Sequence, residues 1–258
     1  MSFPDRPDKH GLPAIVEPRD MLAHRRAGGR IGAIKPPSGA LICLQRGLPE
    51  RLRWRVPIRR VGRLMGDLYA VRRTNGRVIV LSNFGLGAPI VAAQAEELIA
   101  LGATSLVSVA LSGGIQPDLA PGAVVLAESA IRDEGTSHHY LAPAREVAAD
   151  PDLVGALCAA LVARGAVPRQ GRVWSTDAPY RETREEVAGL QAEGVLAVDM
   201  ELAALLAVAR VRGVAAAGVL VVGDSLAGGR WRPPERLDGM ERSLELAYRA
   251  AIEVLDAH

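Results

Sequence analysis

The chain has 258 residues, 49% of them hydrophobic, and its 31 Lys and Arg nearly balance its 29 Asp and Glu, for a formal net charge of +2. This length suits one large α/β domain whose core can be stable without disulfide bonds. The near-balance of charge argues against a nucleic-acid partner. Trp54, Trp174 and Trp231 are too scattered to form a stacking platform for bases, and we expect them in core or interface packing. No stretch is apolar enough to cross a bilayer or act as a signal region, so we expect a cytoplasmic protein with no membrane partner.

The first 38 residues are rich in proline, glycine and charge, which predicts an N-terminal arm (1–38) ahead of a single α/β domain (39–258). An arginine-rich run follows at 46–63, either as a solvated face or as a functional basic patch. Two extended runs then flank Asn75-Gly76, and Asn-Gly is the strongest short signal for a β-hairpin. The sequence therefore predicts a hairpin over 66–82.

Helices and strands alternate through the rest of the chain. Pro89 and Gly102 mark the start and the end of a helix over 89–102. The other expected elements are a short helix near 20–26, strands at 40–44, 105–111, 123–131, 166–174 and 214–222, and helices at 151–164, 183–193, 200–212 and 236–256. This alternation predicts an α/β fold with a mixed, mostly parallel central sheet flanked by helices on both faces.

Polar loops follow the expected strands, at the places where sheets of this kind bind ligands. Each of these loops contains glycine, serine, threonine or aspartate; they are 83–89, 111–117, 132–140, 175–180 and 223–229. Their clustering after strand ends indicates a polar site at one edge of the sheet.

The segment VDMELAALLAVA (198–209) opens with two carboxylates and continues as an almost wholly apolar helix. Burial of an unpaired carboxylate is costly, so Asp199 and Glu201 need partners. A carboxylate that faces a pocket accepts two hydrogen bonds from the vicinal hydroxyls of a ribose, and Met200 offers an adaptable apolar surface beside it. Alternatively, Asp199 caps the helix and Glu201 interacts with its dipole.

Two further motifs each have a structural and a functional interpretation. Asp224 in VVGDSL either caps the next segment or acts as a general acid in a closed pocket. Ser112 in LSGGIQP belongs either to a turn or to a phosphate cradle of hydroxyl and backbone amides. The adjacent His138 and His139 point in opposite directions, and no metal-binding spacing occurs, so we expect no metal.

In this order along the chain, five motifs resemble the nucleoside phosphorylase superfamily, of the purine-nucleoside and uridine phosphorylase type. They are LVSVALSGGIQPDL, IRDEGTSHHY, STDAPYRE, VDMELAALLAVA and VVGDSL. The resemblance implies phosphorolysis of the N-glycosidic bond of a nucleoside, giving a free base and ribose 1-phosphate. Inorganic phosphate is then a co-substrate, and no cofactor is expected. The resemblance also implies a homo-oligomer built from dimers, in many members a hexamer.

On the nucleoside side, the resemblance assigns Met200 and Glu201 to the ribose, with Asp199 where the family often has a longer Glu. His10 resembles a histidine that reaches the sugar 5′-OH across a dimer interface. Asp224 matches the acid with which purine-cleaving members act on the leaving base, whereas IQP and GTSHHY look more like the uridine branch. We favour a purine as the leaving base.

On the phosphate side, Gly47 and Arg51 of RGLPER match the family's phosphate loop, and Ser112 matches a hydroxyl residue that contacts phosphate. Arg63 is the candidate for an arginine lent by a neighbouring subunit. A further family arginine falls here on Ser108. This loss leaves two alternatives open, a nucleosidase in which water attacks the same carbon and a nucleoside-binding protein without activity.

Overall fold

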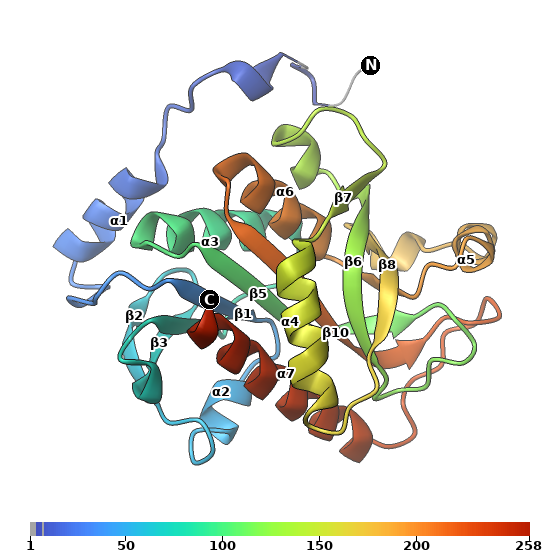
Figure 1. Cartoon of the computed structure of the whole chain (residues 1–258). Coiled ribbons are helices and arrows are strands. Elements are labelled where there is room, and N and C mark those ends of the chain that lie inside the picture. The colour runs from blue at the N-terminus through green and yellow to red at the C-terminus, as the bar shows by residue number, and fades with distance from the viewer. Residues whose placement is uncertain (1–3, 7) are drawn as a thin grey trace.

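The computed structural model describes residues 4–6 and 8–258 (Figure 1). Its strands are β1 (Gly39–Cys43), β2 (Ile58–Arg63), β3 (Asp67–Val71), β4 (Val78–Ser82), β5 (Ser105–Gly114), β6 (Val124–Asp133), β7 (Glu146–Ala148), β8 (Arg169–Thr176), β9 (Ala197–Asp199) and β10 (Ala215–Ser225). Its helices are α1 (Pro18–Ala27), α2 (Leu48–Arg51), α3 (Ala88–Leu101), α4 (Pro151–Val162), α5 (Arg184–Ala192), α6 (Leu202–Arg212) and α7 (Asp238–Ala257), with short 3-10 turns η1 (Lys9–Gly11), η2 (Arg72–Thr74), η3 (Thr136–His139) and η4 (Pro179–Arg181).

The strands form one mixed sheet in the order β10-β6-β8-β9-β5-β1-β4-β3-β2, which confirms the expected fold class. An additional pairing between β10 and β5 closes β5, β10, β6, β8 and β9 into a ring, from which β1, β4, β3 and β2 extend. Strands β4, β1, β5 and β10 run parallel, while β6 pairs with β10 and β9 with β5 in the antiparallel sense. The ring and the strand β2 were not expected from the sequence.

Helices cover the sheet in two packed pairs. Helices α4 and α7 pack together on the side turned toward the viewer in Figure 1, and α3 packs with α6. Buried leucine, valine and alanine side chains between helices and strands form the main core. Helix α6 is almost completely buried over its first eight residues, as its apolar composition predicts.

The predicted hairpin is confirmed as β3 and β4, which pair in the antiparallel sense. Both residues of the Asn75-Gly76 pair adopt positive φ, 51° and 82°, as a turn of the primed type requires. The turn η2 lengthens the connection ahead of this pair.

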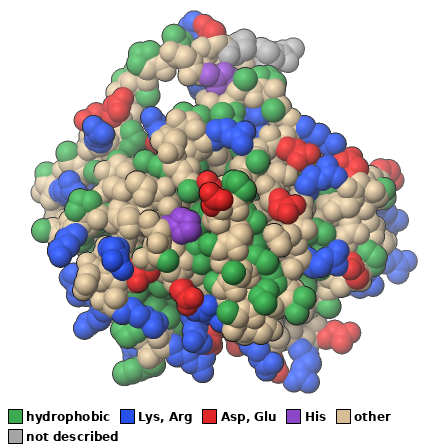
Figure 2. Space-filling view, in the orientation of Figure 1, with side chains coloured by type: hydrophobic (Ala, Val, Ile, Leu, Met, Phe, Trp, Pro, Cys, Tyr) green, Lys and Arg blue, Asp and Glu red, His purple; other side chains and the backbone are tan. Residues whose placement is uncertain are grey.

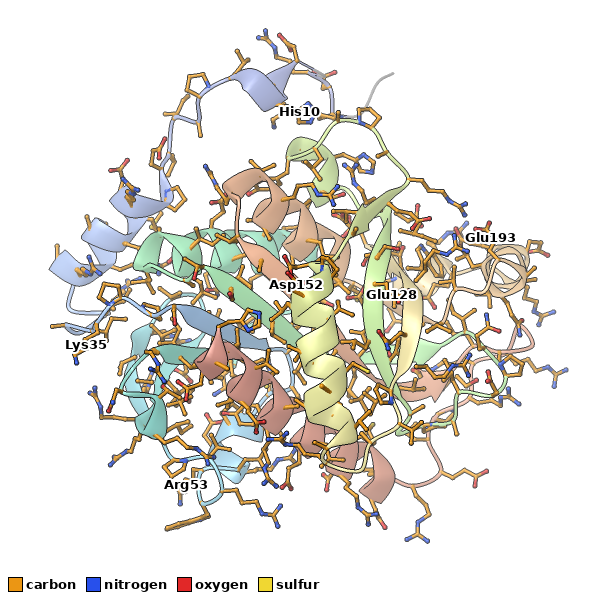
Figure 3. All side chains as sticks on the ribbon, viewed as in Figure 1. His10, Lys35, Arg53, Glu128, Asp152 and Glu193 are labelled. Atoms are coloured by element: carbon orange, nitrogen blue, oxygen red, sulfur yellow. The ribbon has the colours of Figure 1, made fainter. Side chains whose placement is uncertain are left out.

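The arm is fastened to the body at separated points. Helix α1 packs on α3, where the buried guanidinium of Arg25 donates two hydrogen bonds to Glu97, at 2.8 and 2.9 Å. Nearer the N-terminus, His10 Nε2 lies 2.9 Å from the carbonyl oxygen of His138, at the top of Figure 3.

The arginine-rich run forms α2 and β2, with its guanidinium groups at the surface. Arg51, Arg53, Arg55, Arg59, Arg60 and Arg63 are all exposed. Figure 2 shows Lys and Arg side chains gathered along the lower left of one face, and Arg53 projects from this region in Figure 3. Arg60 pairs with Asp67 and Arg55 with Glu245, as in a solvated, partly neutralised face.

Candidate active site

A cavity of about 1260 Å³ opens where β1, β5 and β10 end and β9 meets α6. Four of the five polar loops expected at a ligand site contribute to it, and the loop at 132–140 does not. Its polar and charged lining residues are Gln45, Arg46, Ser112, Glu182, Thr183, Arg184, Asp199, Glu201, Asp224 and Arg230, with Met200, Tyr180 and Trp231 among the apolar and aromatic ones. The position agrees with the general rule for ligand sites at the carboxyl ends of parallel strands.

The register of the sheet explains how three functional segments meet at this cavity. Gly113 of β5 pairs with Val198 of β9 on one side and with Asp224 of β10 on the other. A Cβ atom at Gly113 would lie 3.0 Å from side-chain atoms of both Val198 and Asp224, so a larger residue there would have to displace one of these side chains slightly. Gly113 therefore leaves room at the cavity for the side chains of Val198 and Asp224.

Glu201 is buried, 5% exposed, and its carboxylate is fixed by the main chain. Its Oε1 accepts a 2.7 Å hydrogen bond from the N–H of Gly87, and its Oε2 accepts one from the N–H of Met200 at 3.2 Å. Gly87 has a φ of 102°, a conformation that favours glycine. The glycine-rich loop after β4 thus directs a backbone donor at the carboxylate of Glu201.

The carboxylate of Asp199 accepts hydrogen bonds at the start of helix α6. Its Oδ1 accepts a 2.5 Å hydrogen bond from the hydroxyl of Ser175, and its Oδ2 accepts from the N–H groups of Leu202, at 2.8 Å, and Glu201, at 3.3 Å. These contacts correspond to the capping alternative. Asp199 lines the cavity, but its donors come from the protein.

The two buried carboxylates influence each other. Burial, followed by the neighbouring charge of Asp199, raises the pKa of Glu201 above the usual range for a glutamate. The strand-to-helix junction places both side chains at the cavity wall, although residues two apart within a helix would diverge.

Asp224, on the strand that flanks β5 on the side away from β9, lines the cavity together with an aromatic residue. Its Oδ2 accepts a 2.9 Å hydrogen bond from Nε1 of Trp231, whose side chain is 64% exposed. The expectation of core or interface packing for Trp231 is therefore not met within this chain, because the indole lines the cavity and positions an acid.

Glu182 is a cavity residue that the sequence did not reveal. It is half-buried, and burial, followed by the charges of Asp224 and Glu186, raises its pKa to about 7. No described residue donates a hydrogen bond to its carboxyl group. In the segment YRETREE, Glu182 is one of several charged residues around the start of helix α5, where Thr183 and Glu186 form a capping box. No local pattern distinguishes it from these neighbours.

The residues assigned to phosphate by resemblance do not all reach the cavity. Ser112 lines it. The N–H of Gly47 donates to Oδ1 of Asn83 at 3.0 Å, and the half-exposed Arg51 pairs with Glu241 of α7 at 3.1 Å. Neither lines the cavity, and Ser108 is buried within β5.

Arg63 and His10 also lie outside the cavity of their own chain. Arg63 is exposed at the end of β2, and His10 contacts η3. Arg46, next to the expected phosphate loop, lines the cavity instead, and nothing in the arginine-rich sequence distinguishes it from its neighbours.

The adjacent histidines of η3 have different partners. His138 Nε2 lies 3.1 Å from the carbonyl oxygen of Arg132, and His139 Nδ1 lies 2.9 Å from Nζ of Lys9. Over residues 4–6 and 8–258, no group of three or more His, Cys, Asp or Glu side chains is placed to bind a metal ion. Over the same residues, every helix is too short or too polar to cross a membrane.

Comparison with known proteins places this chain in a family. Residues 46–257 match the family model of the phosphorylase superfamily, and the chain belongs to this superfamily. A uridine phosphorylase from Treponema pallidum is 35% identical over 66% of this chain and 69% of its own length. A purine nucleoside phosphorylase of the DeoD type from Bacillus cytotoxicus is 32% identical over 69% of this chain and 77% of its own length.

Two further comparisons extend this result. A guanosine phosphorylase from Halorubrum lacusprofundi is 28% identical over 68% of this chain and 76% of its own length. The crystal structure of a uridine phosphorylase from Vibrio fischeri superposes with a TM-score of 0.72 at 24% identity, over 87% of this chain and 93% of that one. The likeness to this crystal structure shows a shared fold.

Proposed function

We propose that the protein is a nucleoside phosphorylase, a pentosyltransferase that cleaves a ribonucleoside with inorganic phosphate into a free base and ribose 1-phosphate. The observation that carries this proposal is the buried carboxylate of Glu201, held at the cavity wall by two backbone N–H groups and flanked by Met200. An ionised carboxylate so held keeps lone pairs for the two hydroxyls of a ribose. Membership of the phosphorylase superfamily, with uridine, guanosine and purine nucleoside phosphorylases among the relatives, supports it.

The reaction divides between the two ends of the cavity. Glu201 and Met200 hold the sugar while an oxygen of phosphate bonds to the anomeric carbon and the carbon–nitrogen bond breaks. The electron pair of that bond leaves with the base, and Asp224 hydrogen-bonds or protonates the base as it departs. Catalysis is then mostly positioning and electrostatics. We propose a purine ribonucleoside as the substrate, because Asp224 and Glu182 together place two carboxyl groups at the base end.

Ser108 motivates the alternative of a nucleosidase. A buried serine stands where the family resemblance places an arginine, so one cationic ligand for phosphate is missing at this position. The test is a panel of purine and pyrimidine nucleosides incubated with and without phosphate at constant ionic strength, with free base and ribose 1-phosphate both measured. We expect phosphate-dependent release of base together with ribose 1-phosphate. Release that is independent of phosphate contradicts phosphorolysis in favour of hydrolysis, and binding without release contradicts both.

We also propose a cytoplasmic homo-oligomer built from dimers, in which residues 39–258 form the catalytic domain and residues 1–38 an arm. The family resemblance supports the oligomer, because it assigns His10 and Arg63 to the cavity of a neighbouring subunit, and neither lines the cavity of its own chain. Light scattering in solution measures the subunit number. Mixed assemblies of an H10A chain with an E201Q chain test whether His10 serves a neighbouring cavity: activity above that of either variant alone supports this role, and no gain contradicts it.

A further inference from the structure

Three arginines line the cavity, and only one of them lies at the sheet end where β1 stops. Arg184 at the start of α5 and Arg230 after β10 accompany the acids Glu182 and Asp224. Arg46 follows β1, whose neighbour in the sheet is β5, the strand that carries Ser112. Two of the three arginines therefore have acidic neighbours along the chain, and the third, Arg46, lies beside β1.

The position of Arg46 is tied to that of the sugar-facing carboxylate. Nε of Arg46 donates a 3.2 Å hydrogen bond to the carbonyl oxygen of Phe84. Three residues further along the same loop, the N–H of Gly87 holds Glu201. One short loop thus connects the guanidinium group to the carboxylate on which the sugar would rest.

The arginine expected at this place is engaged elsewhere. Arg51 sits on the outer side of the four-residue helix α2, while Leu48 and Pro49 face inward and are buried. Its guanidinium group pairs with Glu241 on α7. The loop before α2 is fixed in this arrangement because the N–H of Gly47 donates to Asn83, whose own amide donates to Glu50 at 2.6 Å.

We infer that Arg46 binds the phosphate co-substrate at the β1 end of the cavity, in place of the arginine whose position is taken by Ser108. None of the described residues accepts a hydrogen bond from either Nη atom of Arg46, so both remain for a ligand. A guanidinium group with two free amino groups matches the oxygens of a phosphate in a fork geometry. Ser112 lines the same cavity from β5, and its hydroxyl donates to the carbonyl oxygen of Val221 at 3.4 Å. The inference rests on the proposed function for the identity of the anion.

The test compares the wild-type protein with R46Q, R51Q and R59Q, the last being an exposed arginine of β2 that serves as the matched control. The midpoint of thermal unfolding is measured with and without inorganic phosphate, with potassium chloride keeping the ionic strength equal. The KM for phosphate and the KM for nucleoside are measured in parallel.

We expect phosphate to raise the unfolding midpoint of the wild type, R51Q and R59Q but not that of R46Q. The KM for phosphate of R46Q should rise about ten- to a hundredfold, as expected for loss of a charge-assisted contact, with the KM for nucleoside unchanged. A phosphate-induced rise that persists in R46Q, or that is lost in R51Q, overturns the assignment, as does a wild type that phosphate does not stabilise. If the wild type binds phosphate through Arg46 but releases no base, the proposed function fails while the assignment of Arg46 stands.

Discussion

The surroundings of Glu201 and of Arg46, two charged residues of the cavity, are built differently. At the ribose end, Glu201 accepts hydrogen bonds from two backbone N–H groups, and Asp199 accepts three from its surroundings. At the β1 end, Arg46 is held through Nε alone, with both Nη atoms left for a ligand. Under the proposed function, recognition of the sugar is preorganised by the main chain, whereas recognition of the anion is completed by the ligand itself.

The largest expected effect comes from removing the charge at the preorganised end. E201Q keeps the shape of the side chain but replaces two charge-assisted hydrogen bonds, each worth about 1.5–3 kcal/mol, so kcat/KM for purine ribonucleosides should fall roughly 10²- to 10⁴-fold. E185Q in the exposed first turn of α5 is the control and should retain its activity. Near-normal turnover by a folded E201Q would remove Glu201 from the site.

A smaller effect is expected from the partner of Asp224. W231F removes the Nε1–H donor while keeping an aromatic ring, and loss of one hydrogen bond to a charged group should lower kcat for purine nucleosides about tenfold. Nucleosides with an activated leaving group should be affected less, because their departing base needs less help. W54F, at an indole that is 85% exposed and outside the cavity, serves as the control. Equal losses for both kinds of substrate would contradict a role at the leaving base.

Substitution of Gly87, whose N–H donates to Glu201, tests whether this loop orients the carboxylate. G87A places a side chain at a φ of 102°, at a cost of about 1–3 kcal/mol, and displaces the N–H that holds the carboxylate. The KM for nucleoside should rise roughly three- to tenfold, and the KM for phosphate should rise less, because Arg46 contacts the same loop only at Phe84. G76A in the hairpin, where φ is 82°, carries similar strain away from the cavity and should lower the unfolding midpoint without changing either KM. A G87A enzyme with the wild-type KM for nucleoside would separate this loop from Glu201.

The smallest predicted effect is a dependence of binding on pH. The pKa of Glu201 is raised by burial and by the charge of Asp199, so Glu201 takes up a proton at higher pH than an ordinary glutamate does. Its protonated form offers fewer acceptors to a diol, so the KM for ribonucleosides should rise several-fold as pH falls below neutrality. The KM for 2′,3′-dideoxynucleosides, which lack the diol, should stay flat over the same range. A parallel rise for both substrates would assign the titration to another group.

The elements that the sequence predicts well are those with strong local signals. The Asn75-Gly76 hairpin and the helix between Pro89 and Gly102 each depend on neighbouring residues, and both are found within a residue or two of the expected bounds. Closure of the ring by β10 and β5 depends on pairing between strands about a hundred residues apart, and no local pattern encodes it.

The candidate site follows a similar division. The sequence singled out Met200, Glu201 and Asp224 near the ends of expected strands, and all three line the cavity. Asp224 itself lies within β10, which continues to Ser225. Whether Arg46 or Arg51 faces the cavity depends on a four-residue helix and on an ion pair with a residue 190 positions away, which the local sequence does not contain.

The most direct test of the account is a double-mutant cycle between Glu201 and the sugar diol. The kcat/KM for phosphate-dependent cleavage is measured for a purine ribonucleoside and for its 2′,3′-dideoxy counterpart, in the wild type and in E201Q. We predict that the wild type strongly prefers the ribonucleoside and that E201Q loses nearly all of this preference. A preference that remains intact in E201Q would contradict the assignment of Glu201 to the ribose.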